Sequence, residues 1–258
     1  MATFEDKPLF FVKREGRYQP ISWRAAAGDV EAWALWLLSQ EVRVGDRVLL
    51  LCENRPEWGI ADLAIQSVGA WTVPVYPSLT VQDLTAIASD CQPIIGIAST
   101  MDQLRKLVEV RARIPSMKTL LLIEEGQAEG SPGVQHWSGA LAQGRERSER
   151  LRDLLRERRR QQQPSETCTL IYTSGTTGEP KGVMLSHRNF LSNVEACRQV
   201  IPITPSDCHL SFLPLCHVFE RMAGWYLMMR AGASIAYAES METVPQNMLE
   251  VRPTIMLG

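Results

Sequence analysis

The spacing of hydrophobic positions changes several times along this 258-residue chain, and each change predicts an element. Two short apolar-rich runs flank a polar turn at residues 14–17, which predicts a hairpin. Ser22 is then suited to cap a helix, since apolar residues recur at helical spacing from Trp23 to Leu37. This helix has one apolar face, and we expect that face to pack on a sheet.

From Gly45 onward, short apolar runs alternate with segments of helical spacing. Buried strands are predicted at residues 46–52, 70–76, 93–99 and 118–123. Helices are predicted between them, the first beginning at Pro56. Strands separated by helices of about ten residues form βαβ units. The pattern therefore predicts an α/β fold with mainly parallel sheets covered by helices.

Between residues 124 and 164 the apolar periodicity fades. The segment from Arg145 to Arg160 contains eight arginines but only four acidic residues. We interpret this segment as a solvated helix on a connector, because the acids are spaced to pair along a helix. Binding of anionic lipid or nucleic acid is the alternative, although no aromatic residue interleaves the arginines.

Alternation returns after residue 165. Strands are predicted at residues 166–172, 209–215, 233–238 and 253–258, and helices at 186–200, 219–230 and 244–251. The expected organisation is a first α/β subdomain (1–123), a connector (124–164) and the start of a second α/β subdomain (165–258).

Composition narrows the class of protein further. A hydrophobic content of 45% supports a sizeable core, and a net charge of −2 provides no general attraction for nucleic acid or an anionic membrane. The six cysteines have irregular spacing and no C-x-x-C pair, so we expect reduced thiols in the cytoplasm and no metal site. No apolar run reaches the roughly 20 residues of a spanning helix, which leaves only peripheral membrane contact open.

The stretch LIYTSGTTGEPKGVML, residues 170–185, carries the strongest chemical signal. A predicted strand leads into a loop from Thr173 to Lys181, at the edge where open α/β sheets bind ligands. Gly175 and Gly178 allow positive φ and close approach to a ligand. Four hydroxyls and one ammonium group suit a polyphosphate, although an ordinary Gly/Ser turn is the alternative. The hydroxyls belong to Thr173, Ser174, Thr176 and Thr177.

Spacing excludes three other motifs. Glu179 and Pro180 separate Gly178 from Lys181, which breaks the P-loop signature. The dinucleotide fingerprint G-x-G-x-x-G is absent. Tyr172 stands two positions before Ser174, so there is no nucleophile elbow.

The segment YTSGTTGEPKGV, residues 172–183, resembles the phosphate-loop motif of the adenylate-forming (AMP-forming) superfamily of acyl-CoA synthetases, luciferases and peptide-synthetase adenylation domains. LPLCHVFERMAGWY (213–226) is similar to the next motif in the form typical of long-chain fatty acid CoA ligases. GAWTVPVYPSLT (69–80) is similar to an early structural turn. The resemblance covers the whole chain and implies part of the large N-terminal domain of such an enzyme.

The resemblance implies roles for individual residues. The loop would wrap the β- and γ-phosphates of ATP, with Thr176 as a hydroxyl donor and Lys181 as charge partner of the leaving pyrophosphate. His217 would line the acyl-carboxylate pocket; its alternative role is a satisfied histidine at a helix start. Whether Glu220 and Arg221 pair structurally or touch substrate stays open. The implied nucleotide-binding residues are Thr173, Ser174, Gly175, Thr176, Thr177, Gly178 and Lys181.

The implied reaction joins a fatty acid to coenzyme A through acyl-AMP, with ATP and Mg²⁺. No nucleic acid is involved. Several motifs of the family, including Y-G-x-T-E and a C-terminal lysine domain, do not occur in this sequence. The resemblance therefore predicts the N-terminal portion of a longer ligase, with a C-terminal part supplied by a longer chain. A non-catalytic remnant, or the nucleotide-binding half of a split ligase, is the alternative.

Overall fold

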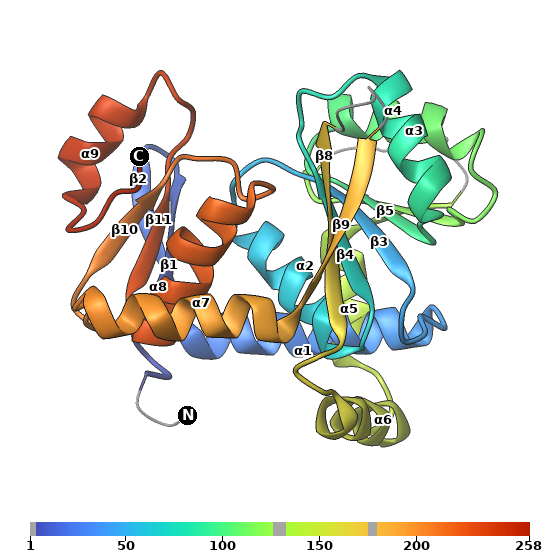
Figure 1. Cartoon of the computed structure of the whole chain (residues 1–258), viewed down its shortest axis with the longest axis horizontal. Helices are drawn as coiled ribbons and strands as arrows, with labels where there is room; N and C mark the ends of the chain where they lie inside the picture. The colour runs from blue at the N-terminus through green and yellow to red at the C-terminus, as the bar shows by residue number, and fades with distance from the viewer. Residues whose placement is uncertain (1–3, 126–132, 175–179) are drawn as a thin grey trace. The chain divides into compact units, whose positions relative to one another are not determined.

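The computed structural model describes residues 4–125, 133–174 and 180–258, and the chain divides into two compact units. Unit 1 comprises Met1–Asp29, Asn54–Ile60 and Arg188–Gly258, and unit 2 comprises Val30–Glu53 and Ala61–His187. Each unit contains one sheet, and each is described by itself (Figure 1). The linear division at residues 123 and 164 stays a prediction.

Unit 2 is built on a seven-stranded sheet with the order β7-β6-β5-β3-β4-β8-β9. Its strands are β3 (Arg47–Leu51), β4 (Trp71–Val75), β5 (Ile95–Ala98), β6 (Thr119–Leu122), β7 (Val134–His136), β8 (Thr167–Ser174) and β9 (Pro180–Ser186). All neighbours are parallel except β8 and β9, which run antiparallel. The apolar runs are continuous because both faces are buried, as in β3, where Val48 to Leu51 are inaccessible to solvent. The α/β prediction is confirmed.

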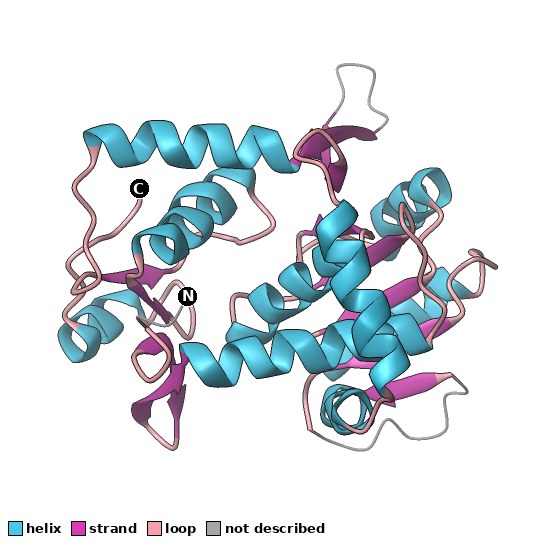
Figure 2. Ribbon diagram, turned by 90° about the horizontal axis from the view of Figure 1, so that it is seen from below, coloured by secondary structure: helices cyan, strands magenta, loops and turns pink. Residues whose placement is uncertain are grey.

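Helices flank these strands (Figures 1 and 2). They are α1 (Trp23–Ser39) and α2 (Pro56–Ser67), which contribute residues to both units, and α3 (Val81–Cys91), α4 (Met101–Arg111), α5 (Trp137–Arg145) and α6 (Glu149–Gln161). Leu84 of α3 and Leu104 of α4 pack with Leu49 and Val73 of the strands in one apolar cluster. Thr80 begins α3 with a capping box, so local sequence and packing agree on where this helix starts.

The segment predicted as a connector contributes to the core of unit 2. β7 extends the sheet, and the Trp137 ring of α5 stacks on the Trp33 ring of α1 with centroids 4.4 Å apart. A Cβ atom on Gly144 would lie 1.9 Å from the carbonyl oxygen of Ala32, so only glycine allows this approach of α5 to α1. The sequence analysis predicted neither element.

α6 is the solvated helix expected from the arginine-rich segment. Leu155 is its one buried side chain. Arg158 donates from Nη1 to the carbonyl oxygens of Val42 (2.8 Å) and Val68 (2.9 Å), just beyond the C-terminal ends of α1 and α2. Arg156 forms ion pairs with two acids of its own helix, at 2.7 and 2.8 Å. These contacts give several of the arginines structural partners.

Unit 1 has a four-stranded sheet with the order β10-β11-β1-β2. Its strands are β1 (Pro8–Arg14), β2 (Arg17–Ser22), β10 (Cys208–Ser211) and β11 (Ser234–Tyr237). The predicted hairpin is confirmed, with Glu15 and Gly16 at positive φ in its turn. β1 also pairs in parallel with β11, near the other end of the chain.

The other helices begin mainly where the pattern predicted. They are α7 (His187–Val200), the π-helix η1 (Glu220–Tyr226), α8 (Leu227–Ala231) and α9 (Val244–Val251). The strand predicted at residues 253–258 is wrong, because this segment forms one isolated parallel bridge between His209 and Ile255. In the described part of the chain, no helix has the length and apolarity needed to cross a membrane.

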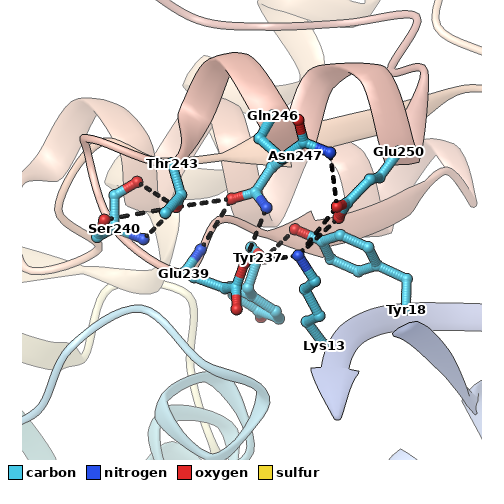
Figure 3. A network of polar contacts seen from close by, with 9 residues as sticks. All are labelled: Lys13, Tyr18, Tyr237, Glu239, Ser240, Thr243, Gln246, Asn247 and Glu250. Atoms are coloured by element: carbon cyan, nitrogen blue, oxygen red, sulfur yellow. Dashed lines mark hydrogen bonds and ion pairs between the residues drawn. The ribbon is translucent and has the colours of Figure 1, made fainter. Parts of the chain in front are cut away.

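A polar network attaches α9 to the β1–β2 hairpin (Figure 3). The Lys13 ammonium lies 2.9 Å from the Glu239 carboxylate and 2.8 Å from that of Glu250. Asn247 donates from Nδ2 to Glu239 at 3.1 Å, and the Tyr18 hydroxyl donates to the carbonyl of Tyr237 at 3.0 Å. The network therefore links the β1–β2 hairpin to β11 and α9, which lie more than 200 positions later in the sequence.

Candidate functional site

The β8–β9 hairpin positions the segment predicted to bind phosphate. β8 is joined to β4 at Thr72 and Thr169, where the Thr169 hydroxyl donates to the Thr72 carbonyl at 2.6 Å. Both threonines are fully buried. β8 ends at Ser174, so the segment that follows begins at the carboxyl end of a parallel strand, as predicted. The sequence analysis did not predict β9, which begins at Pro180.

Two predicted ligand residues face each other across the hairpin. Thr173 and Lys181 are cross-strand partners, and Ser174 pairs with Pro180. Thr173 and Lys181 are exposed, so a hydroxyl donor and a cation stand beside the ends of the loop. Gly175, Thr176, Thr177 and Gly178 lie outside the described residues, and the roles predicted for them stay predictions.

A tyrosine near the loop end of the same hairpin explains why a glycine follows Lys181. Tyr172 pairs across the strands with Gly182, and a Cβ atom on Gly182 would lie 3.1 Å from Cζ of the ring. The ring thus covers the glycine, and its hydroxyl donates to the carboxylate of Asp90 at the end of α3. Burial, and then this hydrogen bond, raise the pKa of Tyr172 well above its ordinary value. The contact ties the hairpin to α3.

His217 lies in unit 1, in the segment between β10 and η1. Its backbone N–H donates to the Pro214 carbonyl at 2.9 Å, and its carbonyl accepts from Arg221 N at 3.1 Å. Nδ1 of the ring accepts from the N–H of Phe219 at 3.2 Å. From this hydrogen bond we assign the proton of the neutral ring to Nε2. The side chain is exposed, so Nε2–H can donate to an anionic oxygen.

Glu220 and Arg221 are buried, with 1% and 0% exposure. The hydroxyl of Ser211 donates to Glu220 Oε1 at 2.6 Å, and His209 Nε2 lies 3.0 Å from the same oxygen. The Arg221 guanidinium lies 5.2 to 5.8 Å from three aromatic ring centroids. Those rings belong to Trp58, Phe190 and Tyr226. Both side chains therefore pack within unit 1, which favours a structural role for them.

Gly224 makes room for this buried carboxylate. A Cβ atom there would lie 2.5 to 2.7 Å from the carboxylate atoms of Glu220. Glu220 Oε2 is buried and has no hydrogen-bond partner among the described residues. A glycine is therefore needed at position 224 as long as the Glu220 carboxylate is buried against it.

The sequence analysis missed Asn54, which contacts the segment leading to His217. Its Nδ2 donates to the Leu213 carbonyl at 2.6 Å, and its Oδ1 accepts from Leu215 N at 2.9 Å. A polar residue three positions after the end of β3 and two positions before the helix-starting Pro56 was the available signal. Such positions at the carboxyl edge of a sheet frequently carry function.

The thiol of Cys216, which precedes His217, is not activated as a nucleophile. Burial raises the pKa of the Cys216 thiol to about 12, so the thiol stays protonated at neutral pH. All six cysteines are free. Across residues 4–125, 133–174 and 180–258, no three His, Cys, Asp or Glu side chains come together as metal ligands.

The family description "AMP-binding enzyme" matches residues 1–258. The chain belongs to this family. The most similar proteins include the long-chain-fatty-acid–CoA ligase ACSBG2 of Gallus gallus, 33% identical over 220 residues. They also include the long-chain-fatty-acid–CoA ligase FadD15 of Mycobacterium bovis, 29% identical over 249 residues. These matches cover 82% and 95% of this chain but only 28% and 39% of the relatives.

Solved structures of adenylate-forming enzymes share the fold. The anthranilate CoA ligase AuaEII, in complex with anthranoyl-AMP, aligns with a TM-score of 0.81 at 22% identity, covering 99% of this chain and 47% of that one. ATP-bound MatB from Rhodopseudomonas palustris aligns with a TM-score of 0.75 at 19% identity, covering 100% and 47%. The chain thus corresponds to slightly less than half the length of each of these two enzymes.

Proposed function

We propose that this chain supplies the phosphate-binding and carboxylate-facing part of an ATP-dependent long-chain fatty acid CoA ligase. The observation that carries the proposal is the cross-strand pair Thr173 and Lys181 beside the loop at the carboxyl end of β8. Membership of the AMP-binding family and relatives named long-chain-fatty-acid–CoA ligases support it.

The chemistry has two steps. A fatty acid carboxylate oxygen attacks the α-phosphorus of ATP, the bond to the bridging oxygen breaks, and pyrophosphate leaves. The sulfur of coenzyme A then attacks the acyl carbonyl and AMP leaves. Lys181 would offset charge on pyrophosphate, and the Nε2–H of His217 would donate to an oxygen of the carboxylate or α-phosphate. Thr176 would add a hydroxyl donor from the loop.

The proposed reaction also uses Mg²⁺ and coenzyme A. A Mg²⁺ ion bound together with ATP would supply charge neutralisation at the phosphates. We assign no residue of this chain to Mg²⁺ or to coenzyme A, and derive no step through the metal.

The chain spans 28 to 39% of the length of the relatives compared above, so the proposal concerns a part of the catalyst. Adenine stacking and the C-terminal lysine would come from sequence beyond these 258 residues, in the same chain or in a partner. We propose a cytoplasmic setting, with contact to membranes restricted to the surface. A chain without catalytic partners would instead be a nucleotide-binding remnant.

The test measures pyrophosphate and ATP binding to residues 1–258 by isothermal titration calorimetry. Lys181→Ala should weaken pyrophosphate binding by roughly 10- to 100-fold, as expected for losing a hydrogen bond to a charged group. Lys118→Ala is the matched control, because Lys118 is an exposed lysine just before β6, at the amino end of a parallel strand. Equal affinities for the two variants would remove Lys181 from the phosphate site. Binding that depends on Lys181 without adenylation, once the missing part is supplied, would favour the remnant.

A further inference from the structure

Asn54 reaches the segment before His217 with three hydrogen bonds from one side chain. Nδ2 donates to the Leu213 carbonyl (2.6 Å) and to Ser211 Oγ (3.1 Å), and Oδ1 accepts from Leu215 N (2.9 Å). Both amide hydrogens and one lone pair of the side chain are therefore used. Asn54 stands 161 positions before Leu215 in the sequence, yet both belong to unit 1.

A second, buried layer supports this contact. Ser211 receives the Asn54 hydrogen bond and donates its own to Glu220 Oε1 at 2.6 Å. His209 Nδ1 lies 3.3 Å from the Ile255 carbonyl oxygen, and its Nε2 lies 3.0 Å from Glu220 Oε1. Ser211, His209 and Glu220 are at most 1% exposed. The chain is thus held on both sides of His217, by Asn54 before it and by Glu220 after it.

We propose that Asn54 is a positioning residue for His217. By holding Leu213 and Leu215, Asn54 fixes the turn in which the Phe219 N–H donates to Nδ1 of His217. This arrangement keeps the neutral imidazole as the Nε2–H tautomer, with its donor on the exposed side of the ring. Its catalytic meaning rests on the proposed role of His217, whereas the structural claim stands without it.

The test reads the tautomer directly. The chain contains four histidines, so ¹⁵N NMR of the imidazole nitrogens can resolve His217 and report its ratio of Nε2–H to Nδ1–H. In Asn54→Ala this ratio should fall roughly 3- to 10-fold, the scale of one modest hydrogen bond. Asn193→Ala is the matched control, because Asn193 is exposed on α7 and bonds within its own helix. Its ratio should equal that of the unsubstituted chain.

A second variant keeps the test decisive if Asn54→Ala does not fold. Asn54→Asp has nearly the same shape and can still accept from Leu215 N, but it cannot donate to the Leu213 carbonyl. Amide exchange at Leu215 should stay slow in Asn54→Asp, while the tautomer ratio falls. An unchanged ratio in folded Asn54→Asp would overturn the proposal. No ATP is needed, so failure of the pyrophosphate-binding test would leave this result standing, and the reverse.

Discussion

The hairpin that carries Lys181 and the segment that carries His217 are held in different ways. Lys181 is exposed, and its position follows from the backbone pairing of β8 with β9. His217 is also exposed, but its segment is held by the side chains of Asn54 and the nearly inaccessible Glu220. A segment held by backbone pairing tolerates replacement of its exposed side chains, whereas a buried polar network loses stability when one partner is removed.

The largest expected effect comes from breaking the buried network. Glu220→Ala should lower the free energy of unfolding of unit 1 by about 3 to 5 kcal/mol, because the buried side chains of Ser211 and His209 would lose the carboxylate oxygen that they share. Lys181→Ala should change stability by less than about 0.5 kcal/mol, as is usual for exposed positions. Urea denaturation measures both, with the exposed Glu242→Ala in unit 1 as the matched control. A cost for Glu220→Ala no greater than that of Glu242→Ala would remove the difference between the two segments.

A smaller effect on stability is expected at Tyr172, near the loop end of the β8–β9 hairpin. Its pKa in the folded chain is raised, first by burial and then by the Asp90 hydrogen bond. Its contribution to stability is therefore complete below pH about 10, where the unfolded side chain titrates, and is lost as the pH rises toward the folded pKa. Tyr172→Phe should flatten the loss of stability between pH 9 and 11.

Asp90→Asn sharpens the same prediction. The carboxylate raises the pKa of Tyr172, so Asp90→Asn should shift the NMR titration of this ring to lower pH, while burial keeps the pKa above its ordinary value. Asp102→Asn, at an exposed acid at the start of α4, should leave the Tyr172 titration in place. Identical titrations in both variants would show that Asp90 does not hold the ring.

The smallest expected effect lies at α9, because the Glu239 and Glu250 side chains of its ion pairs are 45% and 29% exposed to water. Hydrogen bonds from Lys13 lower the pKa of Glu239 and Glu250. Their contribution is therefore present above the ordinary glutamate pKa of about 4.3 and is lost as the pH falls through the lowered values. Amide protection factors in α9, which are corrected for the intrinsic slowing of exchange in acid, should fall more between pH 6 and 3 in the unsubstituted chain than in Lys13→Met. An equal fall in both would show that these ion pairs do not hold the helix.

Much of the fold follows from the hydrophobic pattern, because both faces of the parallel strands are buried and most helices carry a clear start signal. β9 was missed, since Lys181 to Leu185 pair with β8 while exposing most of their side chains, so no buried run marks the strand. α5 was missed because neither a capping side chain nor a proline marks its start, unlike the shorter α9. The position of α5 depends on Trp33, which lies far away in the sequence.

The candidate site could be proposed from the sequence only where the chemistry is local. The stretch from Tyr172 to Val183 contains its own donors and glycines, and the structure places Thr173 and Lys181 together as partners. Asn54 could not be found in this way, because its importance arises only when a loop after β3 meets a loop after β10. Glu220 and Arg221 were ambiguous for the same reason, since burial of a charged pair is a tertiary property.

The pairing of β1 with β11 also sets an order of events during synthesis. All strands of unit 2 have been made once residue 187 leaves the ribosome, whereas β1 must wait for residues 234–237 before it has its parallel partner. At roughly 5 to 20 residues per second, the roughly 50 intervening residues take about 3 to 10 s. The nascent chain is therefore expected to carry a folded unit 2 while the β1 side of the β1–β2 hairpin still lacks β11, and during this time a chaperone could bind that open edge.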